Sequence, residues 1–335
     1  MLEALRRGFT GLGRNWGLVV VAFSVNIALA LLVALPLASQ LERDLDHTGV
    51  SASMMYGFDH DWWTHWSEDQ EGYTRSLAPD VFGTGFAARN VDLLLRGFVP
   101  GRVFREAGKE AHAALLLARR PRGLDPLLLG LGVLYLVVQT FLTGGLLGVF
   151  RAPQGGWTLR GLIHGSGFYF GRLIRVGLLG LGLVGIVFAA NVPFARWVDE
   201  LAREAVSEET ALALLLGRHF LLLLAILLVH MVASFARVIV VQQERQSAAL
   251  AFVSSLGFCS RNLAASAGQY GAVLLLALVL FGAWASIDAR LLVVGWKSQL
   301  VAFALFQVFL LSRIGLRLAL LASQLELHRA QQGRR

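Results

Sequence analysis

The chain of 335 residues has a single cysteine, two lysines and few charged side chains of any kind. Charged residues make up 16% of the sequence and hydrophobic residues 56%, whereas about a quarter of a soluble domain is charged. The lone Cys259 excludes an internal disulfide and a cluster of thiolate metal ligands. Its simplest interpretation is a small buried apolar residue. The composition is that of a protein whose main solvent is lipid.

Catalytic motifs and buried acids are also missing. The sequence contains no nucleophile elbow, HExxH motif, phosphate-binding loop or kinase signature. No Asp or Glu lies inside its long apolar runs, although many carriers coupled to protons or cations rely on such carboxylates. The sequence therefore favours a protein that is not an enzyme, disfavours an ion-coupled carrier and implies no cofactor.

Six apolar runs are present, and each is long enough to cross a bilayer core of roughly 30 Å. They cover residues 16–38, 127–150, 173–194, 219–241, 272–287, with an alternative start at Gln269, and 300–320. The first run is too long for a signal peptide, and Pro36 with Ala38 makes a poor cleavage site, so we expect a retained anchor. The sequence predicts an all-α polytopic membrane bundle of about six transmembrane helices, with amphipathic helices at the interface.

The net charge of +8 follows the ends of the apolar runs. Arginines dominate both termini and the loops after the second and fourth runs, while the loop after the third run is acidic. Positive loops tend to remain cytoplasmic, so we predict a cell (inner) membrane protein with both termini inside and no nucleic-acid partner. The arginines at 119, 120 and 122 do not follow this rule, because the predicted topology places them outside the cell membrane.

This topology divides the chain into five parts. Residues 1–15 form a cytoplasmic N-terminus and residues 16–38 the first transmembrane helix. Residues 39–123 form an outer, acidic and Trp-rich segment with amphipathic helices, including one over 103–120. Residues 124–321 form a five-helix transmembrane bundle, and residues 322–335 a basic cytoplasmic tail into which the sixth helix continues.

The outer segment contains the sequence FDHDWWTHWSED at residues 58–69. Its tryptophans, which are Trp62, Trp63 and Trp66, are typical of anchoring at a membrane surface. Its histidines and carboxylates, which are Asp59, His60, Asp61 and His65, are an alternative set of metal ligands suited to zinc or manganese. Their spacing matches no established metal motif, so both interpretations stay open.

Polar residues occur near the middle of four apolar runs. They are Asn26, Gln139, Thr140, His230 and Gln307, with Thr143 beside them. Unpaired polar groups are costly in hydrocarbon, so we expect these residues to face the bundle interior. They are either interhelical contacts or a polar pathway.

Two basic residues and several glycines complete the membrane pattern. Arg313 and Arg317 stand one turn apart near the inner end of the last run, where they can reach lipid phosphates or, alternatively, bind an anionic substrate. Gly144 and Gly148 have GxxxG spacing, which indicates close helix packing within the chain or with a partner's helix. A separate helix over residues 246–263 is expected at the inner interface.

Three stretches resemble a known group of proteins. They are FLTGGLLGVF (141–150), the segment from Phe235 to Asn262, and RLALLASQLELHRA (317–330). They resemble bacterial six-span membrane proteins without an assigned function, and the last five spans are similar to the membrane domain attached to some glycerophosphodiester phosphodiesterases. The resemblance implies a helical membrane module. The catalytic domain of those enzymes is absent, so it implies no activity.

The sequence leaves three functions open. The first is a non-enzymatic accessory or scaffold subunit that contacts the bilayer and other membrane subunits. The second is a transporter or channel-like permease that uses the polar residues at mid-membrane. The third is a membrane-anchored metalloenzyme with its site in the outer segment.

Overall fold

The computed structural model describes residues 1–46, 48–50, 59–69, 126–152, 157–288, 290–291 and 295–333, and this part of the chain is helical with no strand. Six of its helices are long and apolar enough to cross a membrane, which confirms the predicted fold class. These helices are α2 (Gly17–Leu45), α7 (Pro126–Arg151), α8 (Leu159–Glu204), α9 (Glu208–Gln243), α11 (Leu263–Asp288) and α12 (Gly295–Gln332).

Several of these helices are longer than the apolar runs that predict them. Helix α8 has 46 residues, which is roughly 69 Å at 1.5 Å per residue and more than a bilayer core needs. It begins before the predicted Leu173 because the intervening polar residues are compatible with a helix, although not with a hydropathy threshold. Thr158 caps its first turn by accepting a hydrogen bond from the Gly161 N–H.

Three shorter helices complete the described structure: α1 (Leu2–Arg14), α4 (His60–Asp69) and α10 (Ala248–Arg261). Helix α10 is the separate helix predicted over 246–263. Helix α1 is not predicted, and it packs along the C-terminal half of α12, where Gly8 allows close approach to Ser323. The predicted helix over 103–120 and the arginines at 119–122 lie outside the described residues.

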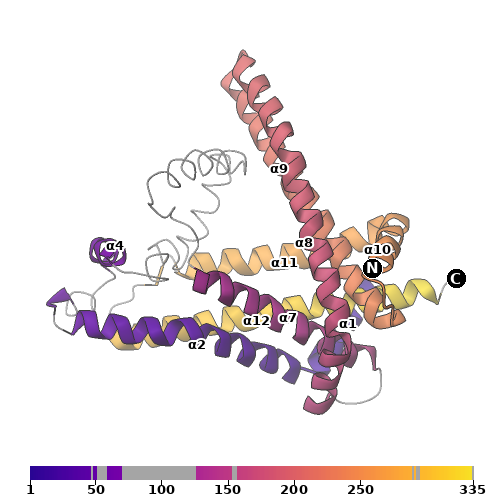
Figure 1. The fold of residues 1–335 in the computed structure, drawn as a ribbon, viewed down its shortest axis with the longest axis horizontal. Helices are drawn as coiled ribbons and strands as arrows, with labels where there is room; N and C mark the ends of the chain where they lie inside the picture. The colour runs from indigo at the N-terminus through magenta and orange to yellow at the C-terminus, as the bar shows by residue number, and fades with distance from the viewer. Residues whose placement is uncertain are drawn as a thin grey trace.

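Figure 1 shows α2, α7, α11 and α12 running along the long axis of the molecule, while the α8–α9 hairpin leaves them at a steep angle. Both termini, α1 and α10 lie at one end. Helices α7 and α8 pack closely because Gly145 and Gly165 have no side chains; a Cβ on Gly145 would lie 2.3 Å from the Leu162 carbonyl oxygen. Gly144, Gly145 and Gly148 of α7 therefore serve packing against α8 within the chain.

Candidate functional site: a polar cavity between α2, α7 and α12

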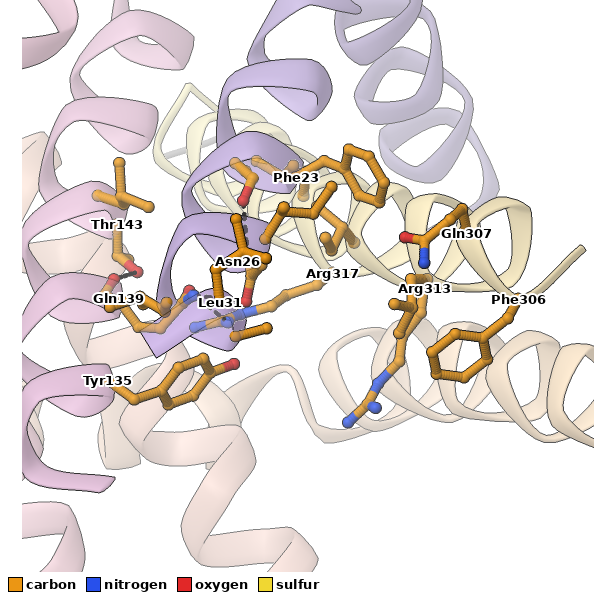
Figure 2. A pocket seen from close by; sticks show the side chains of 18 of the residues that line it. Phe23, Asn26, Leu31, Tyr135, Gln139, Thr143, Phe306, Gln307, Arg313 and Arg317 are labelled. Atoms are coloured by element: carbon orange, nitrogen blue, oxygen red, sulfur yellow. Dashed lines mark hydrogen bonds between the residues drawn. The ribbon is translucent and has the colours of Figure 1, made fainter. Parts of the chain in front are cut away.

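A cavity of about 660 Å³ lies between α2, α7 and α12. Most of its lining is apolar, and Figure 2 shows its polar side chains converging from the three helices. Those polar residues are Asn26, Tyr135, Gln139, Thr143, Gln307, Arg313 and Arg317. Leu31, Phe303 and Phe306 also line the cavity and are exposed. Because exposed apolar side chains of a membrane helix face lipid, the cavity opens toward the bilayer.

A chain of hydrogen bonds joins the three helices across this cavity. The Gln139 Nε2 donates to Asn26 Oδ1 at 3.1 Å, and Arg317 Nη1 donates to Gln139 Oε1 at 2.9 Å (Figure 2). Asn26 itself donates to the Ala22 carbonyl oxygen one turn earlier in α2. Gln139 therefore uses both ends of its amide, and the link orients the Arg317 guanidinium toward the cavity.

The depth of this chain follows from its place in the helices. Asn26 lies nine residues after the start of α2, and Gln139 lies twelve residues before the end of α7. At 1.5 Å per residue both are roughly 14–18 Å from the nearer helix end, which is close to the middle of a bilayer core of about 30 Å. Arg317 is bonded to Gln139, so its guanidinium lies at the level of Gln139 along α7.

The sequence expectation counts the position of Arg317 from the end of the apolar run at residue 320. Helix α12, however, does not end at residue 320. It continues to Gln332, and side chains beyond Arg317, including Leu318, Leu325 and Leu327, are buried in the protein. The burial of this extension keeps Arg317 away from the end of the helix. Contact with lipid phosphates stays a prediction for both arginines.

The remaining polar groups of the lining leave the cavity electropositive. Arg313 makes no hydrogen bond or ion pair with any described residue, and Gln307 Oε1 is buried without a partner among them. No Asp or Glu is found among the lining residues in the described part of the chain. The cavity therefore offers spare donors on two guanidinium groups and no carboxylate of its own to neutralise them.

Two of the predicted mid-membrane residues lie elsewhere. Thr140 donates its hydroxyl to the Leu136 carbonyl oxygen of its own helix and does not line the cavity. His230 of α9 forms a 2.7 Å hydrogen bond with the Tyr270 hydroxyl of α11. The predicted polar set is therefore divided between the cavity and a separate contact of α9 with α11.

Tyr135 is the cavity residue that sequence reasoning missed. It lies one helical turn before Gln139 and lines the same cavity as Arg317. A residue four positions before a polar residue lies on the same helix face. The spacing of Tyr135 and Gln139 was therefore the feature of the sequence that could have indicated Tyr135 as a cavity residue. The signal is weak because tyrosine is also common at membrane surfaces.

The outer tryptophans lie in and around α4. Trp63 and Trp66 are buried, Trp62 stacks on Trp66 with ring centroids 5.5 Å apart, and Trp66 Nε1 donates to Asp44 Oδ2 at 2.7 Å. This last bond ties α4 to the end of α2. Anchoring at the membrane surface stays a prediction for these residues.

Two of the candidate metal ligands of the same segment, Asp59 and His65, have other partners in the described structure. Asp59 accepts a hydrogen bond from the Trp62 backbone N–H at the start of α4, and the ring of His65 contacts the Asp61 carbonyl oxygen at 2.7 Å. The described residues bring together no group of three His, Cys, Asp or Glu side chains that could hold a metal ion. The side chain of His60 is not described, so this metal site stays a prediction.

Comparison with known protein families, curated proteins and solved structures finds no match for the chain. The resemblance to the membrane domain of glycerophosphodiester phosphodiesterases therefore stays an expectation. The proposed function therefore rests on the geometry of the α2–α7–α12 cavity.

Proposed function

We propose that this chain is a permease-type membrane protein that binds an amphipathic solute in the α2–α7–α12 cavity and allows it to cross the bilayer. The observation that carries the proposal is the hydrogen-bonded chain Asn26–Gln139–Arg317, set at mid-membrane in an apolar cavity that opens toward lipid. Polar and charged residues inside a membrane typically mark a solute pathway.

The size of the cavity supports a small solute. Its volume of about 660 Å³ lies within the range of roughly 300–1,000 Å³ that small-molecule sites occupy.

The polar residues of α12 also form a path along the membrane normal. Gln307, Arg313 and Arg317 all line the cavity, and ten residues of helix cover roughly 15 Å. A polar head group that exchanges partners along this row avoids the cost of entering hydrocarbon unpaired. An apolar chain attached to it remains in lipid throughout.

The proposed orientation places both termini in the cytoplasm of a cell with this protein in its inner membrane. The termini lie at one end of the molecule (Figure 1), together with α1, whose arginines at 6, 7 and 14 make it basic. The loop between α8 and α9 is flanked by acids, including Glu204, Glu208 and Glu209. This distribution follows the excess of positive charge in cytoplasmic loops.

Transport of fluorescent amphiphiles into proteoliposomes tests the proposal. Probes that carry a nitrobenzoxadiazole (NBD) label on the acyl chain report their leaflet through dithionite quenching. We expect the protein to accelerate their crossing, and Gln139→Leu to slow it because this change removes both hydrogen bonds of the chain. Thr140→Leu and His230→Leu should retain the rate, since neither residue lines the cavity. A wild-type rate equal to that of empty liposomes would refute the proposal.

An accessory or scaffold subunit is the second candidate, and the open face of α8 favours it. A Cβ added at Gly177, Gly182 or Gly185 would meet no described atom within 4 Å, in contrast to one added at Gly145 of α7. Small residues allow another helix to approach closely. Purification in mild detergent should then recover a stoichiometric partner that Gly182→Leu releases, whereas a monomer from the native membrane would count against this function.

A further inference from the structure

We infer that the solute of the α2–α7–α12 cavity is an anionic amphiphile, with one phosphate or carboxylate head joined to an apolar chain. This inference rests on the proposed function, because it names the solute of the same cavity. It is carried by two guanidinium groups without a neighbouring carboxylate in the described lining and by the apolar wall beside them.

The charge of the lining selects the head group. Arg313 and Arg317 stand one turn apart on α12, and like charges at this spacing repel each other. An ion inside a membrane or a protein is costly unless it is paired, yet the described lining provides no Asp or Glu. An anionic head supplies the missing charge, whereas a neutral or cationic head does not.

The unused hydrogen-bond donors of the cavity also favour an anionic head group. A guanidinium carries five N–H donors, and Arg317 directs one of them to Gln139. Arg313 donates to no described residue. Phosphate and carboxylate oxygens accept pairs of such donors, often from one arginine at a time. The donors left over on this face of α12 therefore match the acceptors of an acidic head.

The apolar wall fits a chain on the same molecule. Phe23, Ile27 and Leu31 of α2 face the cavity across from Phe306 of α12, and Figure 2 shows Phe23, Leu31 and Phe306 around the arginines. A free inorganic anion would have to leave water and enter hydrocarbon to reach the arginines, which is costly. A lipid-like chain lies against this wall and extends through the open side among the surrounding acyl chains.

Equilibrium binding to the purified full-length protein in detergent tests the inference. Three probes carry the same NBD-labelled acyl chain: a lysophosphatidate, a fatty acid and a neutral monoacylglycerol, with inorganic phosphate as the competitor without a chain. We expect both acidic probes to bind at least about tenfold more tightly than the neutral one, since hydrogen bonds to charged groups are strong. Millimolar phosphate should not displace them.

Variants assign the binding to the two arginines. Arg313→Gln should weaken the acidic probes about tenfold or more and leave the fold intact, because Arg313 has no described partner to lose. Arg317→Gln should do the same, and Arg317→Lys should retain part of the affinity through its charge. Arg196→Gln, an exposed position on α8, is the matched control and should bind like the wild type.

The outcomes separate this inference from the proposed function. Equal binding of all three probes, unaffected by Arg313→Gln, would overturn the anionic head and leave an amphiphile permease standing. Displacement by phosphate at the concentration of the probes would overturn the requirement for a chain. Failure of every probe to bind would overturn the inference and the proposed function together.

Discussion

The position of Arg317 in the structure depends on how α12 packs against its neighbours. Counted along its apolar run, it stands near the membrane edge, where a long side chain reaches the surface. In the structure it is bonded to Gln139, twelve residues before the end of α7. The sequence shows that Asn26, Gln139 and Gln307 are deep, but it does not show which of them meet, because this depends on how each helix is rotated. His230 is equally deep and faces Tyr270 instead.

Cys259 provides a prediction at the same scale. Its side chain is 2% exposed, and burial raises the pKa of its thiol to about 11 from an ordinary value near 9. Because the thiolate is the reactive form, the folded protein should resist maleimide at pH 7.5 and still resist it near pH 9. Val253→Cys, at an exposed position of the same helix, is the control and should label rapidly.

The raised pKa of the Cys259 thiol determines how this site changes the folding stability with pH. The folded protein keeps a thiol proton that the unfolded chain has already released, so this site's contribution to stability declines as the pH rises from about 9 to about 11. Labelling of Cys259 in the wild type at neutral pH, as fast as in a denatured sample, would contradict the burial of α10 against its neighbours.

Gly145 tests the close packing of α7 on α8. Gly145→Ala places a methyl group against the Leu162 carbonyl oxygen and the Ser166 hydroxyl, and overpacking of this kind costs about 1–3 kcal/mol. Gly132→Ala on the same helix meets nothing within 4 Å and should be neutral or slightly stabilising. Thermal unfolding in detergent compares the stability of the two variants. Equal midpoints would contradict the close packing of Gly145 against α8.

At the scale of elements, the apolar runs predict the six long helices well and their ends poorly. Hydropathy detects the part of a helix that lies in lipid, and a helix such as α8 continues beyond it. Helix α1 escapes a search for apolar runs because it is short and polar. Ion pairs from Glu3 to Arg6 and Arg7 stabilise it, and hydrogen bonds from both arginines lower the pKa of the Glu3 carboxyl.

The α8–α9 hairpin depends on an ion pair whose two members are buried to different extents. Arg218 is almost fully buried and donates to Asp199, which is about a third exposed. Asp199→Ala removes the charged partner of a buried guanidinium and should destabilise the protein. The cost should stay below the roughly 3–5 kcal/mol of a fully buried pair, because Asp199 is partly exposed and Arg218 keeps a hydrogen bond to the Ala195 carbonyl oxygen. The exposed neighbour Glu200→Ala should cost little. Thermal unfolding, together with proteolysis near Val206, measures the difference, and similar stability of both variants would show that the pair is dispensable.

At the scale of the whole molecule, we predict that the six candidate spans place both termini on one side of the membrane and the α8–α9 loop on the other. In a Cys259→Ala background, an impermeant maleimide added to intact cells should label Val206→Cys, at the exposed loop, but not Gly333→Cys. Gly333→Cys should react after the membrane is permeabilised. Labelling of Gly333→Cys in intact cells would reverse the orientation, and labelling of both would contradict the even number of crossings.

An experimental density map of the protein in nanodiscs made from its own membrane lipids shows directly whether the α2–α7–α12 cavity holds an amphiphile. We expect a head group within hydrogen-bond distance of Arg313 or Arg317 and a chain lying along Ile27 and Leu31. A cavity that is closed, or that is filled by side chains of the protein itself, would contradict this expectation.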